Sequence, residues 1–362
     1  MRRLLGGASS VAAALVLSFI PAPSAPAAPA GLATPPGPRI PYLVGDAGTW
    51  TIHDGAGVIT LPTSIVDNTG QVVESPGFFR LLGKSAHGYV VAEFADSSDE
   101  NPAFRVQQLQ LHMVHPDGTA RTFYDRSGAG KIFEAGKLDD TADRVLVGSG
   151  SAENGVLHYR SVRFDGVPTP VKIGKQPLVL DWPSARRLLV SSPFGHAFGP
   201  WTWHVAVHNL VDHTTTPLPG IGEHRAQTTR VASLGADLFG WRLPTPRPST
   251  PVTTAFARLS RPHHVLWKAT FDAISFNPTD HRVLGWKDRR LTQQFPRGPL
   301  EIRRASDGRL VATLDYGFPV VDSVVWEDAS HVLVTSLGSV VRCGVDGVCA
   351  QVFDSPGTVD FP

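Results

Sequence analysis

Short hairpins with an Asp-Gly turn recur along this chain, and their spacing restricts the folds that are open to it. Asp-Gly between two runs that alternate apolar and polar residues is the strongest local signal for a β-hairpin. Clear copies turn at Asp54, Asp117, Asp165, Asp307 and Asp346, and degenerate copies turn near Asp212 and Arg261. The mean spacing of these seven turns is about 49 residues, which falls within the range of propeller blades.

Two further strands precede most of these hairpins. Segments 137–149, 178–191, 273–286 and 323–336 each contain an apolar strand, a polar turn and a second, dense apolar strand. The repeating unit therefore has four strands, which we name a, b, c and d, and strands c and d form the hairpin. Helical periodicity is scarce, and 35 Gly and 31 Pro fit a turn-rich all-β chain. We predict an all-β, seven-bladed β-propeller of four-stranded blades over residues 40–362.

The two ends of this region predict how the ring closes. The first unit begins at residues 40–45 and lacks an inner strand, whereas residues 358–361 follow the last hairpin as an unassigned short strand. We expect this C-terminal strand to serve as strand a of the first blade, which would remove the open sheet edges. A pair of β-sandwiches is the alternative, because sandwiches also have regularly spaced short strands.

Two of the units resemble a known family. Residues 273–286 followed by 300–314 are similar to a blade of WD-repeat or TolB-like propellers: apolar-x-Phe-x-Pro, a polar turn, an apolar strand and an outer Asp-Gly hairpin. The hairpin at 342–349 resembles a terminal hairpin of secreted TolB-like propellers. The Trp-Asp dipeptide of WD repeats is absent from the sequence. The resemblance implies a binding platform and supplies no catalytic residues.

The N-terminal residues have the pattern of a secretory signal. Arg2 and Arg3 form a positive start, 11–20 is an apolar stretch too short to span a bilayer, and 28–30 reads Ala-Pro-Ala, a cleavage motif. No cysteine lies near this motif, which argues against a lipid-anchored lipoprotein. We therefore expect 1–30 to be a signal peptide, 31–39 a flexible Pro-rich segment and the mature protein to be secreted. No later stretch is apolar enough for a membrane span.

The two cysteines of the chain flank one of the predicted turns. If residues 345–347 form a three-residue hairpin loop with Gly347 at positive φ, Cys343 and Cys349 are directly opposed. Opposed residues of antiparallel strands have Cα separations suited to a disulfide. A metal pair and a redox dithiol are the alternatives, but zinc needs more ligands and the spacing is not C-x-x-C. We predict a structural disulfide, which persists outside the cytoplasm.

Four long loops, all expected between strands b and c, suggest a binding surface on one face of the ring. They span 95–103, 192–200, 243–252 and 287–298. The first is acidic, the second is aromatic and leads into Trp201 and Trp203, and the last is basic. The alternative is that these loops are solvent-exposed and bind no ligand, with their aromatic side chains packed against the loop itself. The candidate ligand-binding residues are Asp96, Asp99, Phe194, Phe198, Trp201, Arg289 and Arg290.

Signals for metals and for catalysis are weak. His204 and His208 share one strand face but lie about 13 Å apart along an extended chain, too far to hold one ion. The acidic run 96–100 lacks an EF-hand pattern, so we expect no metal and no cofactor. The chain has no G-x-S-x-G motif. Three aspartates, Asp181, Asp272 and Asp322, fall near the inner strands that line the axial channel of a propeller. They are either channel acids with a catalytic role or residues that hydrogen-bond within turns and at strand starts.

Charge and loops together give a functional hypothesis. The net charge of +1 argues against a nucleic-acid-binding protein, because such proteins normally carry an excess of basic residues. We expect a monomeric, non-catalytic binding module whose ligand is an exported protein, a peptide or a cell-wall glycan. A secreted hydrolase or lyase that uses carboxylates or histidine in the axial channel is the second hypothesis, and a purely structural envelope protein is the third.

Overall fold

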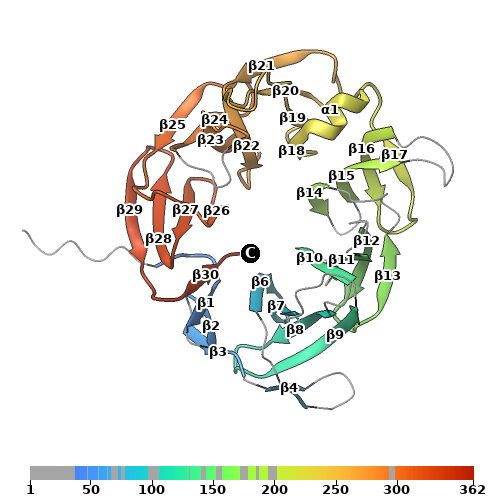
Figure 1. Ribbon diagram of the computed structural model, residues 1–362, viewed down its shortest axis with the longest axis vertical. Helices are drawn as coiled ribbons and strands as arrows, with labels where there is room; N and C mark the ends of the chain where they lie inside the picture. The colour runs from blue at the N-terminus through green and yellow to red at the C-terminus, as the bar shows by residue number, and fades with distance from the viewer. Residues whose placement is uncertain are drawn as a thin grey trace, which may run out of the picture. The chain divides into compact units, whose positions relative to one another are not determined.

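Seven sheets follow one another along the chain and form the blades of a ring in the computed structural model (Figure 1). The structure describes residues 37–46, 48–55, 57–62, 64–66, 72–74, 78–96, 106–129, 131–139, 144–151, 157–171, 178–184, 187–194, 202–292 and 298–362. Within each blade consecutive strands pair antiparallel, and the innermost strands of several neighbouring blades contact one another. The predicted seven-bladed propeller is therefore confirmed, and the pair of sandwiches is excluded.

Strand a is the innermost strand of each blade, and strands b, c and d follow it outwards (Figure 1). Blade 1 is β30 (Thr358–Asp360), β1 (Tyr42–Asp46), β2 (Thr49–Asp54) and β3 (Gly57–Thr60). Blade 2 is β6 (Phe78–Ser85), β7 (Gly88–Asp96), β8 (Val106–Val114) and β9 (Ala120–Ala129). Blade 3 is β10 (Lys131–Asp139), β11 (Arg144–Ser151), β12 (Leu157–Arg163) and β13 (Pro168–Val171). Blade 4 is β14 (Leu178–Ser184), β15 (Arg187–Phe194), β16 (Thr202–Asn209) and β17 (Thr215–Pro217).

The remaining three blades complete the ring. Blade 5 is β18 (Thr229–Ser233), β19 (Leu238–Arg242), β20 (Thr254–Arg258) and β21 (Val265–Ala269). Blade 6 is β22 (Phe271–Phe276), β23 (Arg282–Lys287), β24 (Leu300–Arg304) and β25 (Leu310–Leu314). Blade 7 is β26 (Ser323–Trp326), β27 (His331–Ser336), β28 (Ser339–Gly344) and β29 (Cys349–Phe353). All seven predicted hairpins are the c–d pairs of these blades.

Asp and Gly have separate roles in the c–d turns. Gly118, Gly308 and Gly347 adopt φ between 71° and 87°, where a Cβ is unfavourable. The Asp side chain accepts a hydrogen bond from the amide two residues later, as from Thr119 N to Asp117 Oδ1 at 2.9 Å. In blade 4 His213 takes the glycine position at φ 59°, which explains why that copy looks degenerate.

The C-terminal strand closes the ring as predicted. β30 pairs antiparallel with β1, with Val44 opposite Val359. Val359 and Phe361 are 6% and 4% exposed and pack with Tyr42 and Val44 and with blade 7 residues such as Val352. The Asp360 carboxylate accepts a hydrogen bond from Leu81 N at 2.9 Å, which joins blade 1 to blade 2. The last residues of the chain therefore hold the first blade in place.

Apolar residues between neighbouring blades form the core. One cluster, for example, joins Trp286 and Leu300 of blade 6 to Val332 and Val334 of blade 7. Dense packing of strand b and c side chains between blades is what makes each blade depend on its neighbours. The alternating apolar runs of the sequence supply these side chains.

The disulfide is present. Cys343 and Cys349 are opposed across β28 and β29 with a Cα separation of 4.1 Å, and they form the bond Cys343–Cys349. Gly347 has φ 87° in the intervening loop, as predicted. The predicted disulfide is therefore confirmed, and with both sulfurs in this bond neither is available as a thiolate ligand for a metal.

Two elements were not anticipated. A small hairpin, β4 (Ser64–Val66) with β5 (Val72–Glu74), adds to the outer edge of blade 2 through a parallel contact with β9. A six-residue helix, α1 (Glu223–Thr228), contacts blades 4 and 5 and buries Ala226 completely. A helix with one buried residue is too short to show periodicity in the sequence. No helix in the described part of the chain is long and apolar enough to cross a bilayer.

Replacing Phe361 by Ala tests the closure. Phe361 is 4% exposed, and removing a buried phenyl ring typically costs about 3–5 kcal/mol of unfolding free energy. We expect a loss of this size in urea denaturation, whereas Val348→Ala, at a 67% exposed position in blade 7, should change stability by less than about 0.5 kcal/mol. Equal stability of the two variants would contradict the closure.

A second test concerns His208, whose side chain is fully buried and whose Nδ1 lies 2.8 Å from Thr215 Oγ1. Burial lowers the pKa of His208 to about 4. Because the unfolded chain titrates at its higher, ordinary pKa, stability is lost as pH falls from about 6.5 towards 4. At pH 4.5 the loss should be about 2 kcal/mol relative to pH 7.5. In His208→Gln this part of the pH dependence should disappear; an unchanged pH profile would contradict the assignment.

Candidate functional site

The structure places only some of the residues predicted to bind ligand. Asp99, Phe198 and Trp201 lie outside the described residues. Asp96 and Phe194 are the last residues of β7 and β15, and only their backbones are described. Arg289 and Arg290 are described and lie just after β23. All four long loops do connect strands b and c, because they join β7 to β8, β15 to β16, β19 to β20 and β23 to β24.

The long loop of blade 5, residues 243–253, is part of the framework. Val252 is fully buried, and its amide donates to the Arg289 carbonyl at 2.7 Å. Its own carbonyl accepts from Phe271 N at 2.9 Å. This loop therefore fastens blade 5 to blade 6 and fixes the backbone of Arg289.

Arg289 belongs to a buried ion cluster centred on Asp272, a residue of β22 with a side chain 2% exposed. Arg242, at the end of β19, donates from Nε and Nη2 to the two Asp272 oxygens, each at 2.8 Å. Arg289 Nη1 donates to Asp272 Oδ2 at 2.9 Å. The bidentate Arg242–Asp272 pair joins blades 5 and 6, so Asp272 is a structural partner rather than a channel acid.

The other inner-strand carboxylates also have structural partners. Asp181 Oδ2 accepts from Leu234 N at 2.9 Å, which links blades 4 and 5. Asp322 Oδ2 accepts from Leu337 N at 2.7 Å within blade 7. The reading of Asp181 and Asp322 as groups that hydrogen-bond strands and turns agrees with these contacts.

A buried acid–histidine pair lies in blade 2. His112 Nε2 is 2.8 Å from Glu93 Oε2, and His112 Nδ1 is 2.9 Å from Thr122 Oγ1. The His112 and Glu93 side chains are 0% and 4% exposed, so a substrate cannot reach them. This arrangement cross-links strands b, c and d of the blade.

A group with the composition of a metal site lies in blade 7. Ligand atoms of Glu327, Asp328 and His331 lie within 4.8 Å of one another. However, Arg342 donates to both oxygens of Glu327, at 2.6 and 2.7 Å. Asp328 accepts from His331 and from Arg39 Nη1. These carboxylates are neutralised and fully engaged by protein donors, which disfavours a cation here.

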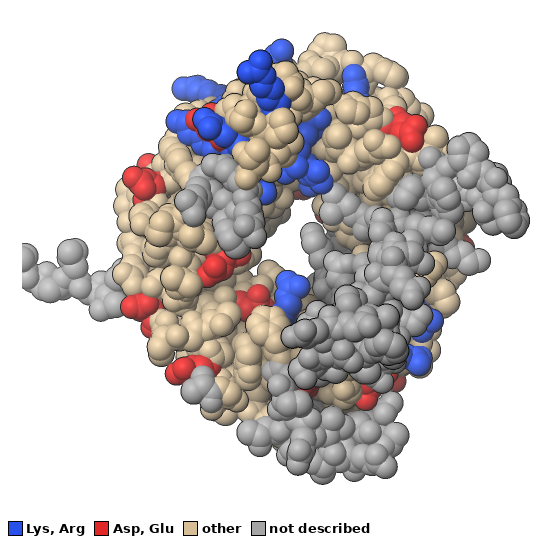
Figure 2. All heavy atoms as spheres, in the orientation of Figure 1, with Lys and Arg blue, Asp and Glu red and all other residues tan. Residues whose placement is uncertain are grey.

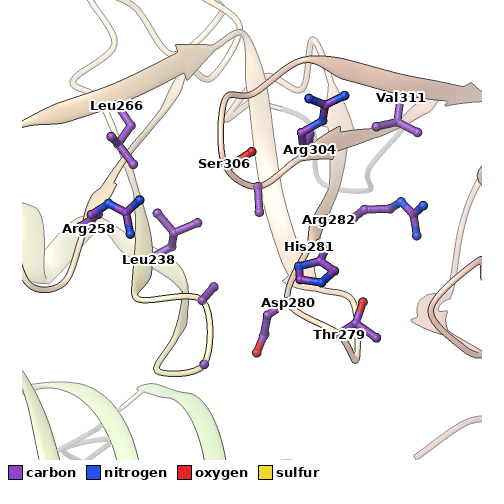
Figure 3. Close-up of a pocket in the computed structure, with 13 residues that line it drawn as sticks. Leu238, Arg258, Leu266, Thr279, Asp280, His281, Arg282, Arg304, Ser306 and Val311 are labelled. Atoms are coloured by element: carbon purple, nitrogen blue, oxygen red, sulfur yellow. The ribbon is translucent and has the colours of Figure 1, made fainter.

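A groove runs between blades 5 and 6 on the opposite face, where the a–b and c–d turns lie (Figure 3). Its volume is about 680 Å³, which is the size of a small-ligand site. Leu238, Leu266 and Arg258 of blade 5 form one wall, and residues of blade 6 form the other. The blade 6 residues include Thr279, Asp280, His281, Arg282, Arg304, Ser306 and Val311.

The walls of the groove are held by hydrogen bonds. Asn277 Oδ1 accepts from Arg282 N at 2.9 Å, and Arg282 Nη1 donates to the Ala329 carbonyl at 2.7 Å. Trp267 stacks on Phe256 at 3.9 Å and donates from Nε1 to the carbonyl of Ala305, a lining residue. The groove is therefore largely preformed.

Asp280 is the one carboxylate among the residues that line this groove. It sits at φ 60°, and within the described chain its carboxylate has no hydrogen-bond or ion-pair partner. Gly235 in the facing turn makes room for it, since a Cβ there would lie 2.3 Å from Asp280 Oδ2. In contrast to Asp280, two of the arginines that line the groove have ion-pair partners: Arg258 pairs with Asp237 at 3.6 Å, and Arg304 pairs with Asp307 at 3.1 Å.

A second hollow of about 480 Å³ adjoins the groove and shares Gly235 and Asp280 with it. Leu180, Asp181 and Phe276 extend its lining to the inner strands β14 and β22. The two hollows together extend from the inner strands of blades 4 and 6 to Val311 on the outer strand β25 of blade 6. Sequence reasoning placed the binding surface on the other face and missed this groove, because its walls come from turns without unusual length.

No family model matches the sequence, and no curated protein matches it. Many solved structures match by shape at low identity. The propeller domain of the Trilobed protease from Pyrococcus furiosus is 13% identical, with 77% of this chain and 86% of that chain covered and a TM-score of 0.49.

Two further structures give similar values. BamB from Moraxella catarrhalis is 12% identical over 86% of this chain and 87% of that chain, with a TM-score of 0.40. A hypothetical selenium-binding protein from Sulfolobus tokodaii is 10% identical over 90% and 92%, with a TM-score of 0.46. At these values we assign no function from the neighbours, and the fold assignment rests on the strand pairing itself.

Replacing Asp272 by Asn tests the ion cluster. The change leaves Arg242 and Arg289 partly buried without their counter-charge, a loss that typically costs about 3–5 kcal/mol. Asp307→Asn removes the exposed pair with Arg304 and should cost less than about 1 kcal/mol. Urea denaturation of both variants makes the comparison, and an Asp272→Asn protein as stable as Asp307→Asn would show that the cluster does not join the blades.

Proposed function

We propose that this protein is a secreted, non-catalytic binding propeller whose ligand is a peptide, a segment of an exported protein or a cell-wall glycan. The groove between blades 5 and 6 carries the proposal. It is elongated together with its neighbouring hollow, and it combines apolar Leu238 and Leu266 with the charged Asp280 and Arg258. A groove that combines apolar side chains on one wall with a few polar groups suits an extended ligand.

The chemistry of the lining supports binding over catalysis. Glycoside hydrolysis by two carboxylates needs a pair of acids across the scissile bond. The described lining of the groove and the adjoining hollow holds two carboxylates, those of Asp280 and Asp181. Asp181 accepts a hydrogen bond from Leu234 N, and His281 makes no hydrogen bond with Asp280. The buried acids described elsewhere, such as Glu93 and Asp272, are engaged by protein partners. A secreted hydrolase or lyase is therefore less well supported.

Two sequence features support export. The N-terminal pattern is that of a signal peptide, and residues 1–30 lie outside the described residues. The disulfide Cys343–Cys349 fits an oxidising compartment. The aromatic and acidic loops between strands b and c, with Phe194, Phe198, Trp201, Asp96 and Asp99, remain a second proposed contact surface.

A blocked groove tests this function. Ser306 is exposed in the c–d turn of blade 6 and lines the groove, so Ser306→Trp should fill it without disturbing the core. Thermal-shift screening of the mature chain against short peptides, oligosaccharides and wall fragments should identify a class that raises Tm. We expect Ser306→Trp to weaken that binding at least about 10-fold, which corresponds to about 1.4 kcal/mol.

Val348→Trp adds the same ring to the exposed c–d turn of blade 7 and should leave the affinity unchanged. Binding that Ser306→Trp does not weaken would remove the groove from the proposal. Turnover of the bound compound would show that the protein is an enzyme.

A further inference from the structure

A third arginine lies beside the Asp272 cluster and is not needed to hold it together. Arg230 is the second residue of β18, Asp272 is the second residue of β22, and Arg242 ends β19. All three therefore lie at the end of the blades where the b–c and d–a connections emerge, the face opposite the groove. In Figure 2 Lys and Arg atoms gather over blades 5 and 6, and some of them reach the edge of the central opening.

A β-bulge places Arg230 at this position. The register between β18 and β19 shifts between Thr229 and Val231, so Arg230 has no opposed partner in the ladder. Bulges of this kind re-aim a side chain and are common beside functional sites. The residue before it, Thr229, is held in place, because it is 1% exposed and its hydroxyl donates to the Arg225 carbonyl at 2.7 Å.

The cluster has more positive charge than its protein partners neutralise. Both oxygens of Asp272 already accept from Arg242 and Arg289. Arg230 makes no hydrogen bond or ion pair within the described chain, and Arg289 Nε is buried without an acceptor. Asp288, which precedes Arg289, forms no ion pair with these arginines among the described residues. Three guanidinium groups thus share one carboxylate.

The lowered pKa of Arg230 agrees with this excess of positive charge. Partial burial lowers the pKa of Arg230, and the neighbouring guanidinium of Arg242 lowers it further. An arginine nonetheless stays protonated at neutral pH, so its charge persists. Arg242 and Arg289 both lower the pKa of Arg230, so the three guanidinium groups repel one another, and a bound anion would relieve this repulsion.

We infer that Arg230, Arg242 and Arg289 form a binding site for an oxyanion, a carboxylate or phosphate group carried by a ligand at the axial opening. Guanidinium groups bind these groups through paired, charge-assisted hydrogen bonds. The exposed Arg230 supplies free N–H donors, the partly exposed guanidinium of Arg289 adds positive charge, and Asp272 fixes Arg242 and Arg289. The site is on the opposite face from the groove, and the inference does not depend on the proposed function.

Titration with inorganic phosphate and with citrate tests the site. At constant ionic strength maintained with NaCl, we expect at least one of these anions to raise Tm saturably, by about 3 °C or more. Arg230→Ala should weaken that binding at least about 10-fold in calorimetry. The anion that raises Tm, phosphate or citrate, shows whether the recognised group is a phosphate or a carboxylate.

Arg261→Ala is the matched control, because Arg261 is an exposed arginine of the same blade on the other face and its side chain makes no hydrogen bond or ion pair in the described chain. It should bind the anion as the unaltered protein does, and so should Ser306→Trp. Arg230→Glu should abolish binding and raise Tm without ligand, because the new carboxylate would meet Arg242 and Arg289. The inference is overturned if neither anion acts beyond NaCl, or if Arg230→Ala binds like Arg261→Ala.

Discussion

The pairing of β30 with β1 is the contact on which the rest of the ring depends. It joins residues separated by almost the full length of the described chain, with Val44 opposite Val359. Each blade buries its apolar side chains against its neighbours, so an unpaired first blade would expose β1 and weaken its packing on blades 2 and 7. The entropic cost of closing so long a loop grows only slowly with length, and burial of Val359 and Phe361 offsets it.

Within the closed ring, blades 5 and 6 carry the features that suggest function. Their boundary is fastened on one face by Arg242 and Asp272 and by the hydrogen bonds of Val252. On the other face the turns stand apart and leave a groove with the unpaired carboxylate of Asp280. The Arg242–Asp272 ion pair and the hydrogen bonds of Val252 hold the backbone at this boundary, and charged side chains are present on both of its faces.

The fold was readable from the sequence because its signals are local. An Asp-Gly turn specifies a hairpin through the side chain of Asp and the positive φ of Gly, as Asp117 and Gly118 show. The missing inner strand of the first blade then indicated the role of residues 358–361. Helix α1 was missed because six residues with one buried side chain leave no periodic pattern. The hairpin of β4 and β5 was missed because it lies outside the four-strand repeat.

The sites were less readable because they combine residues that are distant in the sequence. Arg289 was predicted as a binding residue from its basic loop, but its hydrogen bond to Asp272 depends on how the chain folds blade 6. The bulge that re-aims Arg230 leaves no mark in the residue pattern. Of the other predicted site residues, Arg290 lies in the described part of the chain. The side chains of Asp96, Asp99, Phe194, Phe198 and Trp201 lie outside it, so their role stays a prediction.

The closure can be measured directly by crosslinking. Val44→Cys with Val359→Cys places two thiols at directly opposed positions of β1 and β30, within disulfide range. We expect mild oxidation to form an intramolecular disulfide in this variant and to raise its Tm. Val44→Cys with Thr358→Cys should stay reduced, because successive side chains face opposite sides of a sheet. Free thiols in the first variant, or equal crosslinking of both, would show that the chain does not close its ring through this pairing.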